Sequence, residues 1–115
     1  MPMIKKEHRL RKNKHFQYIY RKGQTKQTAF LSVVFVKTHI QPFKVGFSIT
    51  KKVGKSVVRS RVKRLMTEAF NKIEMQVNTG YNYIFVAKPE ISQLSQAEIL
   101  KEMQKVLRKA NLLNE

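Results

Sequence analysis

Lysine and arginine side chains at helical spacing are the residues of this chain best suited to chemistry, and that chemistry is phosphate binding. They crowd residues 51–68, where only Glu68 is acidic. If a helix begins near Ser56, its apolar and polar side chains separate onto opposite arcs. The polar arc comprises Ser60, Arg61, Lys63, Arg64 and Thr67. Further cations lie at or just before its first turn: Lys51, Lys52, Lys55 and Arg59. Because a helix N-terminus already carries about half a positive charge, these cations repel one another until an anion binds.

The overall charge favours a nucleic acid over the other partners that a basic helix could have. The chain has 24 Lys and Arg against 7 acidic residues, which gives a net charge of +17. Self-repulsion of this size costs stability, and a polyanionic partner would relieve it. A solvated basic surface is the alternative interpretation. A membrane-surface role is disfavoured, because Glu68 and Glu74 follow the cations and the helix lacks an exposed apolar face.

The acidic residues are too scattered to build a metal-dependent active site. The chain contains no aspartate, and its glutamates stand singly along the sequence. A protein nuclease that uses two metal ions needs several carboxylates around cations that lie about 4 Å apart. His8, His15 and His39 lack metal-ligand spacing, and there is no cysteine. We therefore expect no catalytic residue, no metal site and no organic cofactor in this chain, and a stand-alone nuclease is disfavoured.

The length and the termini set further expectations. A chain of 115 residues predicts one domain spanning residues 1–115, with a short flexible N-terminus. Residues 1–7 include no apolar segment of the kind that directs secretion. The longest apolar run, Val33–Val36, is too short to span a bilayer. We therefore expect a cytoplasmic protein without a membrane partner.

The order of the predicted elements indicates an α+β protein. Val, Ile, Phe and Tyr concentrate in three predicted strands, at residues 30–36, 44–50 and 81–87. A first helix over residues 14–22 would be capped by Asn13, and residues 24–28 would form a polar connection. The basic helix is expected to run from about residue 56 to residue 77. A last helix follows the capping box that Ser95 and Glu98 form.

The segment from Phe47 to Arg64 resembles the signature of the protein subunit of bacterial ribonuclease P. The family pattern is approximately Ser-Val-Ser-Lys-Lys-x-Gly-x-Ala-Val-x-Arg-Asn-x-x-Lys-Arg, then two residues and Arg-Glu. This chain reads Phe-Ser-Ile-Thr-Lys-Lys-Val-Gly-Lys-Ser-Val-Val-Arg-Ser-Arg-Val-Lys-Arg. The likeness covers nearly the whole chain in the family's order. Its other positions are Leu10, Phe16, Tyr20 and Gly23, then Phe43–Gly46 and Tyr83–Lys88.

This resemblance implies both a fold and a function. The fold would be a single-domain α-β sandwich similar to domain 2 of a ribosomal small-subunit protein, with a left-handed βαβ crossover. The function would be that of endoribonuclease P, in which a catalytic RNA removes the 5′ leader from precursor tRNA by magnesium-assisted hydrolysis. The protein would bind the catalytic RNA and the single-stranded leader, and would aid magnesium binding. Its partners would be the catalytic RNA and precursor tRNA, with magnesium held mainly by the RNA.

The resemblance also assigns roles to individual positions. Those expected to contact the catalytic RNA are Lys52, Lys55, Arg59, Ser60, Arg61, Lys63, Arg64 and Thr67. Ser60 stands where the family usually has Asn, and Thr67 where it usually has Arg, which implies weaker or altered contacts. Those expected around the leader are Phe16, Tyr20, Val33, Phe35 and Lys88. Phe16 and Tyr20 could stack on bases, although both could also be ordinary core residues.

Two other functions fit the same composition. A non-catalytic structural RNA-binding protein of the ribosomal type would share the charge and the fold type, but would not alter RNA cleavage. A DNA-binding module would place the basic helix in a major groove and would not need an aromatic cleft. A cleavage assay with and without the catalytic RNA separates these functions.

Overall fold

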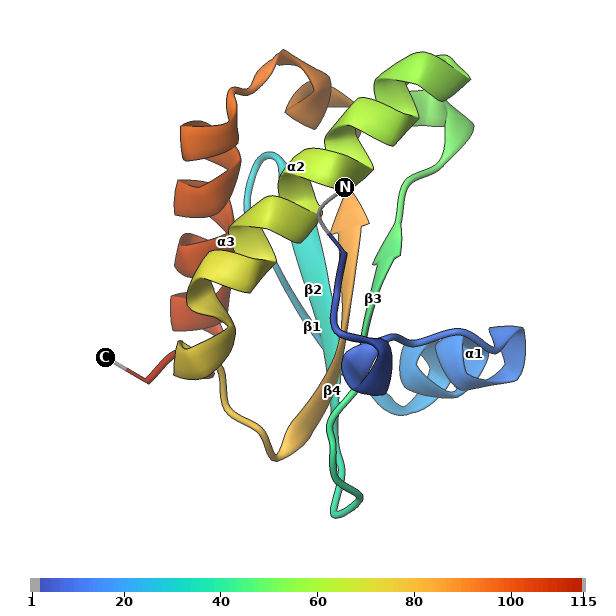
Figure 1. Ribbon diagram of the computed structural model, residues 1–115, viewed down its shortest axis with the longest axis vertical. Helices are drawn as coiled ribbons and strands as arrows, with labels where there is room; N and C mark the ends of the chain where they lie inside the picture. Colours follow the sequence, from blue (N-terminus) through green and yellow to red (C-terminus); the bar gives the residue numbers. More distant parts are fainter. Residues whose placement is uncertain (1–2, 115) are drawn as a thin grey trace.

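A four-stranded sheet with the strand order β1-β2-β4-β3 forms the centre of the molecule (Figure 1). The computed structural model describes residues 3–114. β1 (Gln24–Gln27), β2 (Leu31–Lys37) and β4 (Tyr81–Ala87) are antiparallel to one another in this order. β3 (Val45–Ser48) pairs with β4 in parallel, so that Val45 lies opposite Tyr83. β3 is therefore an edge strand.

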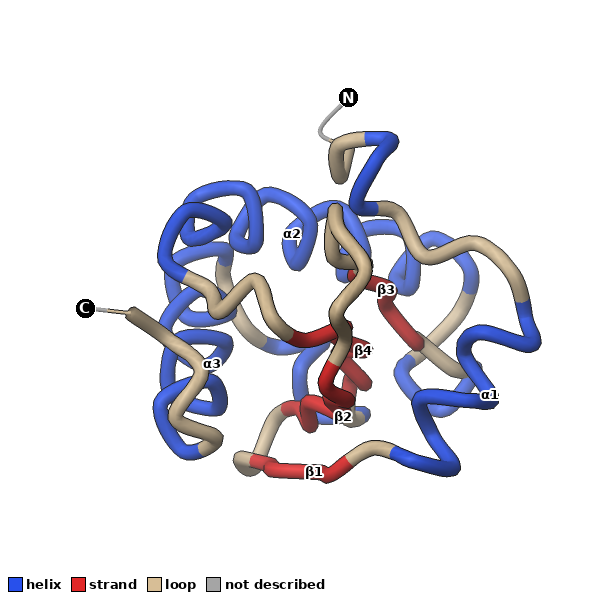
Figure 2. The backbone as a smooth tube through the Cα atoms, turned by 90° about the horizontal axis from the view of Figure 1, so that it is seen from below, coloured by secondary structure: helices blue, strands red, loops and turns tan. Residues whose placement is uncertain are grey.

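Helices cover both faces of the sheet. α2 (Ser56–Ile73) and α3 (Gln96–Lys109) lie on one face, and α1 (Asn13–Lys22) lies on the other (Figure 2). The main core, beneath α2 and α3, includes Phe70 and Phe85. A smaller cluster beneath α1 consists of Leu10, Ile19, Val34 and Ile84. Because successive strand residues face opposite sides, β2 and β4 supply alternate side chains to the two clusters.

The connection β3–α2–β4 is a left-handed crossover. With both strands pointing up, α2 lies in front of the sheet and β4 lies to the left of β3 (Figure 1). The view along the strands in Figure 2 shows the same hand. About 98% of such connections in proteins are right-handed. The α+β class and the unusual crossover are thus confirmed, and only the family resemblance could have predicted the hand.

Most predicted elements are present, and the exceptions have local causes. The predicted connection at residues 24–28 contains the strand β1, whose residues are all polar and exposed. The N-cap of α1 is Lys12 and not the predicted Asn13, which is the first residue of the helix. The Lys12 side chain makes no capping hydrogen bond. α2 ends at Ile73, and a 3-10 turn, η3 (Glu74–Gln76), follows it. The capping box of Ser95 and Glu98 is confirmed.

The N-terminal segment packs against the domain from Met3 onward, and the predicted flexible end is left to residues 1–2, which lie outside the described residues. Ile4 is buried, and the carbonyl of Met3 accepts a hydrogen bond from Asn71 Nδ2 at 3.1 Å. The segment then passes through a 3-10 turn, η1 (Lys6–His8), toward α1. The backbone N–H of Leu10 donates to the carbonyl of Val45 at 3.0 Å, which adds one bridge to β3. Residues 3–10 therefore join α2, β3 and α1.

Candidate nucleic-acid interface

The N-terminal end of α2 gathers cations without a matching acid. A 3-10 turn, η2 (Lys51–Val53), leads into Gly54, whose φ of 154° is a conformation that favours glycine. Lys52 and Lys55 are exposed, and the first turn of α2 contains no acidic residue. Lys55 is the N-cap but makes no side-chain capping bond. The unpaired N–H groups of this turn therefore lie beside cations, an arrangement that suits phosphate oxygens.

One flank of α2 faces the outer edge of β3 across a shallow groove, here called the β3 groove. Arg59, Ser60 and Lys63 line it from the helix, and Phe47 and Ile49 line it from the strand side. Arg59 Nε donates to the carbonyl of Gly54 at 3.1 Å, which holds the guanidinium near the helix N-terminus. Within residues 3–114, the side chains of Ser60 and Lys63 have no hydrogen bond or ion pair. Their donors are therefore free to meet a ligand.

The other flank of α2 uses its arginines to hold the protein together. Arg61 donates through Nη1 and Nη2 to the carbonyls of Ser92 and Leu94, at 3.3 Å and 3.2 Å. These bonds tie α2 to the 3-10 turn η4 (Pro89–Gln93) and the residue after it. Arg64 Nη1 lies 3.2 Å from Glu68 Oε1. The other oxygen of Glu68 accepts a hydrogen bond from Gln96 of α3. The predicted polar arc thus lies on two flanks of α2. The side chains of Ser60 and Lys63 are unpaired within residues 3–114, whereas those of Arg61 and Arg64 bond to other parts of the protein.

Thr67 does not belong to the exposed polar face. Its side chain is only 5% exposed, and its hydroxyl donates to the carbonyl of Lys63 at 2.7 Å. Ile4 and Arg9 of the N-terminal segment line the same small groove as Thr67. The structure therefore corrects the prediction that Thr67 lies on the polar arc that would face the catalytic RNA. Helical spacing alone could not have placed Thr67 correctly, because the covering segment is distant in the sequence.

On the other face of the sheet, α1 leaves part of the strands uncovered. The Phe16 ring packs on Gly46, where an added Cβ would lie only 2.6 Å from Phe16 Cζ. Tyr20, one helical turn later, is 45% exposed. Three half-buried residues that the strand register aligns on this face form what we call the α1-side strip: Ser32, Ser48 and Val86. Phe16 and Tyr20 therefore lie on the helix that flanks this strip.

Val33 and Phe35 lie on the opposite face of the sheet from α1. They are 0% and 5% exposed and belong to the main core beneath α2 and α3. Their predicted role as leader contacts is therefore wrong. The residues of β2 that face α1 are Ser32, Val34 and Val36. Val33 is assigned by counting back without gaps from Phe43, the position that matches the family pattern before β3. This count crosses the loop between β2 and β3, and a one-residue error there turns every side chain to the other face.

Lys88 follows the α1-side strip at the end of β4. Its Nζ donates to Gln27 Oε1 at 2.8 Å and to the carbonyl of Thr28 at 2.6 Å. These bonds connect the end of β4 to the turn between β1 and β2. An ammonium group has three donors, so Lys88 retains one for a ligand.

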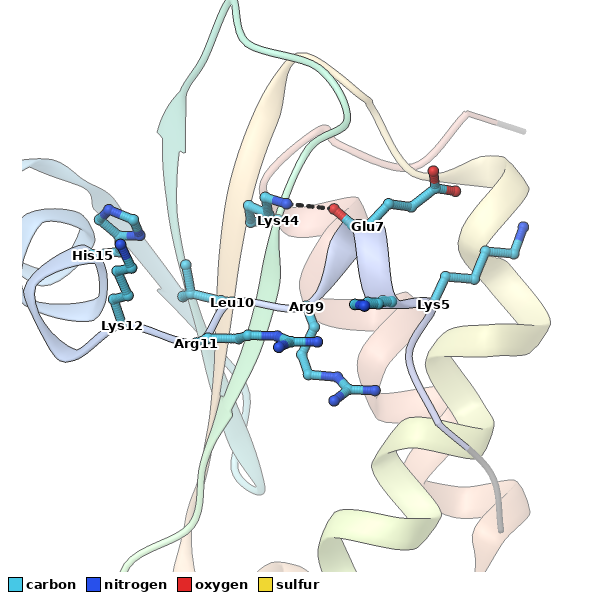
Figure 3. Close-up of a pocket in the computed structure, with 9 residues that line it drawn as sticks. Lys5, Glu7, Arg9, Leu10, Arg11, Lys12, His15 and Lys44 are labelled. Atoms are coloured by element: carbon cyan, nitrogen blue, oxygen red, sulfur yellow. Dashed lines mark hydrogen bonds between the residues drawn. The ribbon is translucent and has the colours of Figure 1, made fainter.

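Sequence reasoning missed a second group of cations, near the start of α1. Arg9, Arg11 and Lys12 line a groove of about 720 Å³ together with Lys44, which precedes β3 (Figure 3). We call it the N-terminal groove. The run Arg9-Leu10-Arg11-Lys12 is visible in the sequence as cations around one apolar residue. Its importance depends on the proximity of Lys44, which the sequence alone does not reveal.

The pKa shifts that the structure produces lie away from these cations. Burial raises the pKa of Tyr83, whose hydroxyl donates to the carbonyl of Asn78 at 2.5 Å. Hydrogen bonds from the backbone and side chain of Ser95 lower the pKa of Glu98. Within residues 3–114, no three His or Glu side chains come together in a way that could hold a metal ion.

These features define a class: a small basic α+β domain with a left-handed crossover and a cation-lined crossover helix. The family model described as Ribonuclease P matches residues 4–111, so this chain belongs to the ribonuclease P protein family. The resemblance recognised from the Phe47–Arg64 segment is confirmed. In the part of the chain that the structure describes, no helix is long and apolar enough to cross a membrane.

Relatives named ribonuclease P protein component match along most or all of their length. The protein of Alkaliphilus metalliredigens is 33% identical over 96% of this chain and 100% of its own. The protein of Alkaliphilus oremlandii is 39% identical over 96% of this chain and 97% of its own. The chain thus belongs to a family of protein components of a tRNA-processing enzyme.

Solved structures of ribonuclease P proteins share the fold. The Staphylococcus aureus protein is 28% identical and has a TM-score of 0.86, over 95% of this chain and 100% of its own. A mutant of that protein, described as defective in mRNA degradation activity, is 27% identical, with a TM-score of 0.85 over 92% of this chain and 90% of its own. The Thermotoga maritima protein, at 21% identity, has a TM-score of 0.80 over 88% of this chain and 96% of its own, and supports the fold alone.

Proposed function

We propose that this chain binds the catalytic RNA of ribonuclease P through the start of α2 and the β3 groove. The observation that carries this proposal is the alignment of Arg59, Ser60 and Lys63 along the outer edge of β3. Ser60 and Lys63 have no partner within residues 3–114, so their donors are available to phosphate oxygens. The net charge of +17 adds counterion release, which supplies much of the affinity of basic proteins for nucleic acids.

The leader of precursor tRNA would lie along the α1-side strip. An unpaired strand is bound best by aromatic and apolar surfaces on which bases stack. Tyr20 offers an exposed ring on α1, and Phe16 lies one turn before it. Val86 provides an apolar contact between the hydroxyls of Ser32 and Ser48. Lys88, at the end of the strip, retains one donor for a phosphate.

In this proposal, the RNA performs the chemistry. The chain has no aspartate, and its described Glu and His side chains do not gather into a metal site. These residues therefore do not fit a magnesium ion of their own, and the ion would be held by RNA phosphates. The cations of α2 would aid magnesium binding indirectly, because they lower the repulsion between phosphates of the assembled RNAs. Such an assembly would work in the cytoplasm.

A binding measurement tests this function. The affinities of precursor tRNA and mature tRNA are measured for the catalytic RNA alone and for the holoenzyme. Because mature tRNA has no leader, the protein should strengthen the binding of the precursor more than that of the mature product. An equal gain for both ligands would contradict leader binding by the protein.

A non-catalytic RNA-binding protein of the ribosomal type remains the alternative function. It would bind RNA through the same cations and would leave cleavage of the precursor unchanged. The Staphylococcus aureus mutant is described as defective in mRNA degradation activity. A further control therefore incubates this chain alone with an mRNA and measures whether the mRNA is cleaved.

A further inference from the structure

The N-terminal groove collects cations from segments that are distant in the sequence. Its cationic and imidazole side chains come from Lys5, Lys6, Arg9, Arg11, Lys12, His15 and Lys44. Glu7 is the acidic residue in its lining. In Figure 3 the side chains of Arg9 and Arg11 both leave the segment that precedes α1. The groove is therefore strongly positive, and it lies outside the segment that gives the chain its family signature.

The backbone that carries these cations is held in place. Lys44 Nζ donates to the carbonyl of Glu7 at 2.5 Å, and this bond is drawn in Figure 3. His8 Nδ1 lies 2.8 Å from the carbonyl of Phe43, and its ring packs on the Phe43 ring at 4.3 Å between centroids. Lys5 Nζ lies 3.2 Å from Glu74 Oε2 on η3. A ligand would therefore meet a preformed groove and would not have to order a loose segment.

Most of these cations have no counter-charge in the protein. Within residues 3–114, the side chains of Lys6, Arg9, Arg11 and Lys12 make no hydrogen bond and no ion pair. The carboxylate of Glu7 lies 3.9 Å from His8 Nε2. Several unpaired cations in one groove repel one another, and an anionic ligand would relieve this repulsion. Arginine guanidinium groups match phosphate oxygens in a bidentate manner.

The N-terminal groove is continuous with the β3 groove. Arg9 and Leu10 line both the N-terminal groove and a smaller groove beside β3, which Lys63 and Phe47 also line. Lys63 and Phe47 in turn line the β3 groove with Arg59 and Ser60. The shared residues connect the cations along the outer edge of β3, from the start of α1 to the start of α2.

We infer that the N-terminal groove is a second phosphate-binding site for the backbone of the catalytic RNA, and that one stretch of RNA covers both grooves. The inference rests on the proposed function, because the β3 groove must bind that RNA. The catalytic RNA is the occupant because Arg9 and Lys63 join the two grooves along β3, whereas the leader is assigned to the α1 face of the sheet. Arg11 and Lys12 are exposed and unpaired within residues 3–114, so they are the residues that meet phosphates most directly.

The test compares two double variants that remove the same charge. Arg11→Ala with Lys12→Ala removes two exposed cations from the N-terminal groove, and Lys101→Ala with Lys105→Ala removes two exposed cations from α3. The groove variant should bind the catalytic RNA about a hundredfold more weakly, because each missing charge-assisted hydrogen bond to phosphate weakens binding about tenfold. The slope of log K against log salt should fall by about 1.5 to 2. For the α3 variant, the change in affinity and the change in salt slope should each be no more than about a third of those expected for the groove variant. The α3 variant reduces only the long-range attraction between the protein's positive charge and the RNA phosphates.

Two further measurements separate failure of this inference from failure of the proposed function. Lys63→Ala tests the β3 groove in parallel. If it weakens RNA binding while the groove variant matches the α3 control, the inference is wrong and the proposed function stands. If neither variant weakens RNA binding, both are wrong. Affinity of the assembled holoenzyme for precursor tRNA should be the same with either double variant, and a loss confined to that measurement would overturn the assignment to the catalytic RNA.

A small probe tests the groove without any RNA. Pyrophosphate is added to the protein, and the backbone amide signals are followed by nuclear magnetic resonance. Signals of residues 9–12 and of Lys44 should shift, and the Arg11→Ala, Lys12→Ala variant should lose this response. Thermal melts that match the wild-type melt confirm that the variant is folded. Shifts confined to the start of α2 would show that the N-terminal groove does not bind phosphate.

Discussion

At the scale of single residues, cations of the same helix have different roles: some bond to the protein itself, and others are available to a ligand. Arg61 bonds to backbone carbonyls of η4 and the following residue, whereas the Lys63 side chain makes no hydrogen bond or ion pair within residues 3–114. They lie two residues apart in the same basic run, so the charge pattern of the sequence does not separate them. What separates them is the flank of α2 on which each lies.

Arg61→Ala should therefore mainly lower the stability of the fold, whereas Lys63→Ala should mainly weaken RNA binding. Arg61→Ala removes two hydrogen bonds and should lower the free energy of unfolding by about 1 kcal/mol, with a smaller effect on RNA binding. Lys63→Ala should leave the melting temperature unchanged and should lower the salt slope of RNA binding by about one. Thermal melts and salt titrations of both variants check this, and a reversed pattern would contradict the assignment of the two flanks.

Tyr20 gives the sharpest residue-level test of the leader site. Because its ring is 45% exposed, Tyr20→Ala should leave the fold intact. It should cost about 1–3 kcal/mol of holoenzyme affinity for precursor tRNA, the range for removal of a base–aromatic stack. Affinity for mature tRNA should barely change.

Tyr18→Ala is the matched control for this variant. Tyr18 lies on the same helix, is 49% exposed, and has its ring near the Arg21 guanidinium, 6.0 Å from the centroid. It lines a different groove, beside Ile40 and Pro42. Equal losses of affinity for the two tyrosine variants, or equal losses for both tRNA ligands, would remove Tyr20 from the leader site.

Thr67→Arg tests whether Thr67 is buried against the N-terminal segment and lies away from the exposed polar face of α2. Thr67 is buried, and a larger charged side chain there should lower the free energy of unfolding by about 1–3 kcal/mol, the usual cost of overpacking. Ser60→Asn, at the other position that departs from the family pattern, lies on the exposed flank and should be tolerated. Denaturant unfolding of both variants checks this. If Thr67→Arg leaves the stability unchanged, the N-terminal segment can move aside without cost, and Thr67 is not firmly buried.

At the scale of elements, local signals predict structure well and tertiary placement poorly. The strand at residues 81–87 and the capping box at Ser95 need only neighbouring residues, and both are confirmed. β1 is not predictable in this way, because an edge strand can be wholly polar. The face of β2 that meets α1 depends on pairing with β4, so sequence reasoning places Val33 and Phe35 on the wrong side. The N-terminal groove depends on a hydrogen bond between residues 7 and 44 and escapes sequence reasoning for the same reason.

The capping box makes the stability of α3 depend on pH. Ser95 donates its hydrogen bonds best to the charged form of Glu98, so the pKa of Glu98 is lowered. A lowered pKa in the folded state contributes stability above the unfolded value of about 4.3, and this contribution disappears as the pH falls below it. Ser95→Ala should cost about 1 kcal/mol at pH 7. That cost should be nearly independent of pH, because the lost bond runs from the Glu98 backbone N–H to the Ser95 hydroxyl. Glu98→Gln removes the charge that the Ser95 backbone N–H favours, so it should be less stable than the wild type at pH 7 and about equally stable at pH 3, as measured by denaturant unfolding. The same stability difference at both pH values would show that the charge of Glu98 does not contribute.

At the scale of the whole molecule, β3 lies between the two proposed RNA surfaces. Its alternating side chains place Gly46 and Ser48 toward α1, whereas Phe47 lines the groove beside α2. The catalytic RNA would run along the outer edge of β3, and the leader would run over its α1 face. One short strand would thus bring the leader close to the catalytic RNA without any catalytic group from the protein. The excess of +17 charges would offset the repulsion between two RNA molecules at this site.

If this chain enables cleavage that the RNA performs, removal of the 5′ leader at low magnesium should need both components. Labelled precursor tRNA is incubated at low magnesium concentration with the chain alone, with the ribonuclease P RNA alone, and with both together. We predict accurate removal of the 5′ leader only when both are present, and recovery of activity by the RNA alone when magnesium is raised, because the added ions replace the protein's positive charge. Cleavage of the precursor by the purified chain without RNA, or no effect of the chain on cleavage by the RNA, would contradict this account.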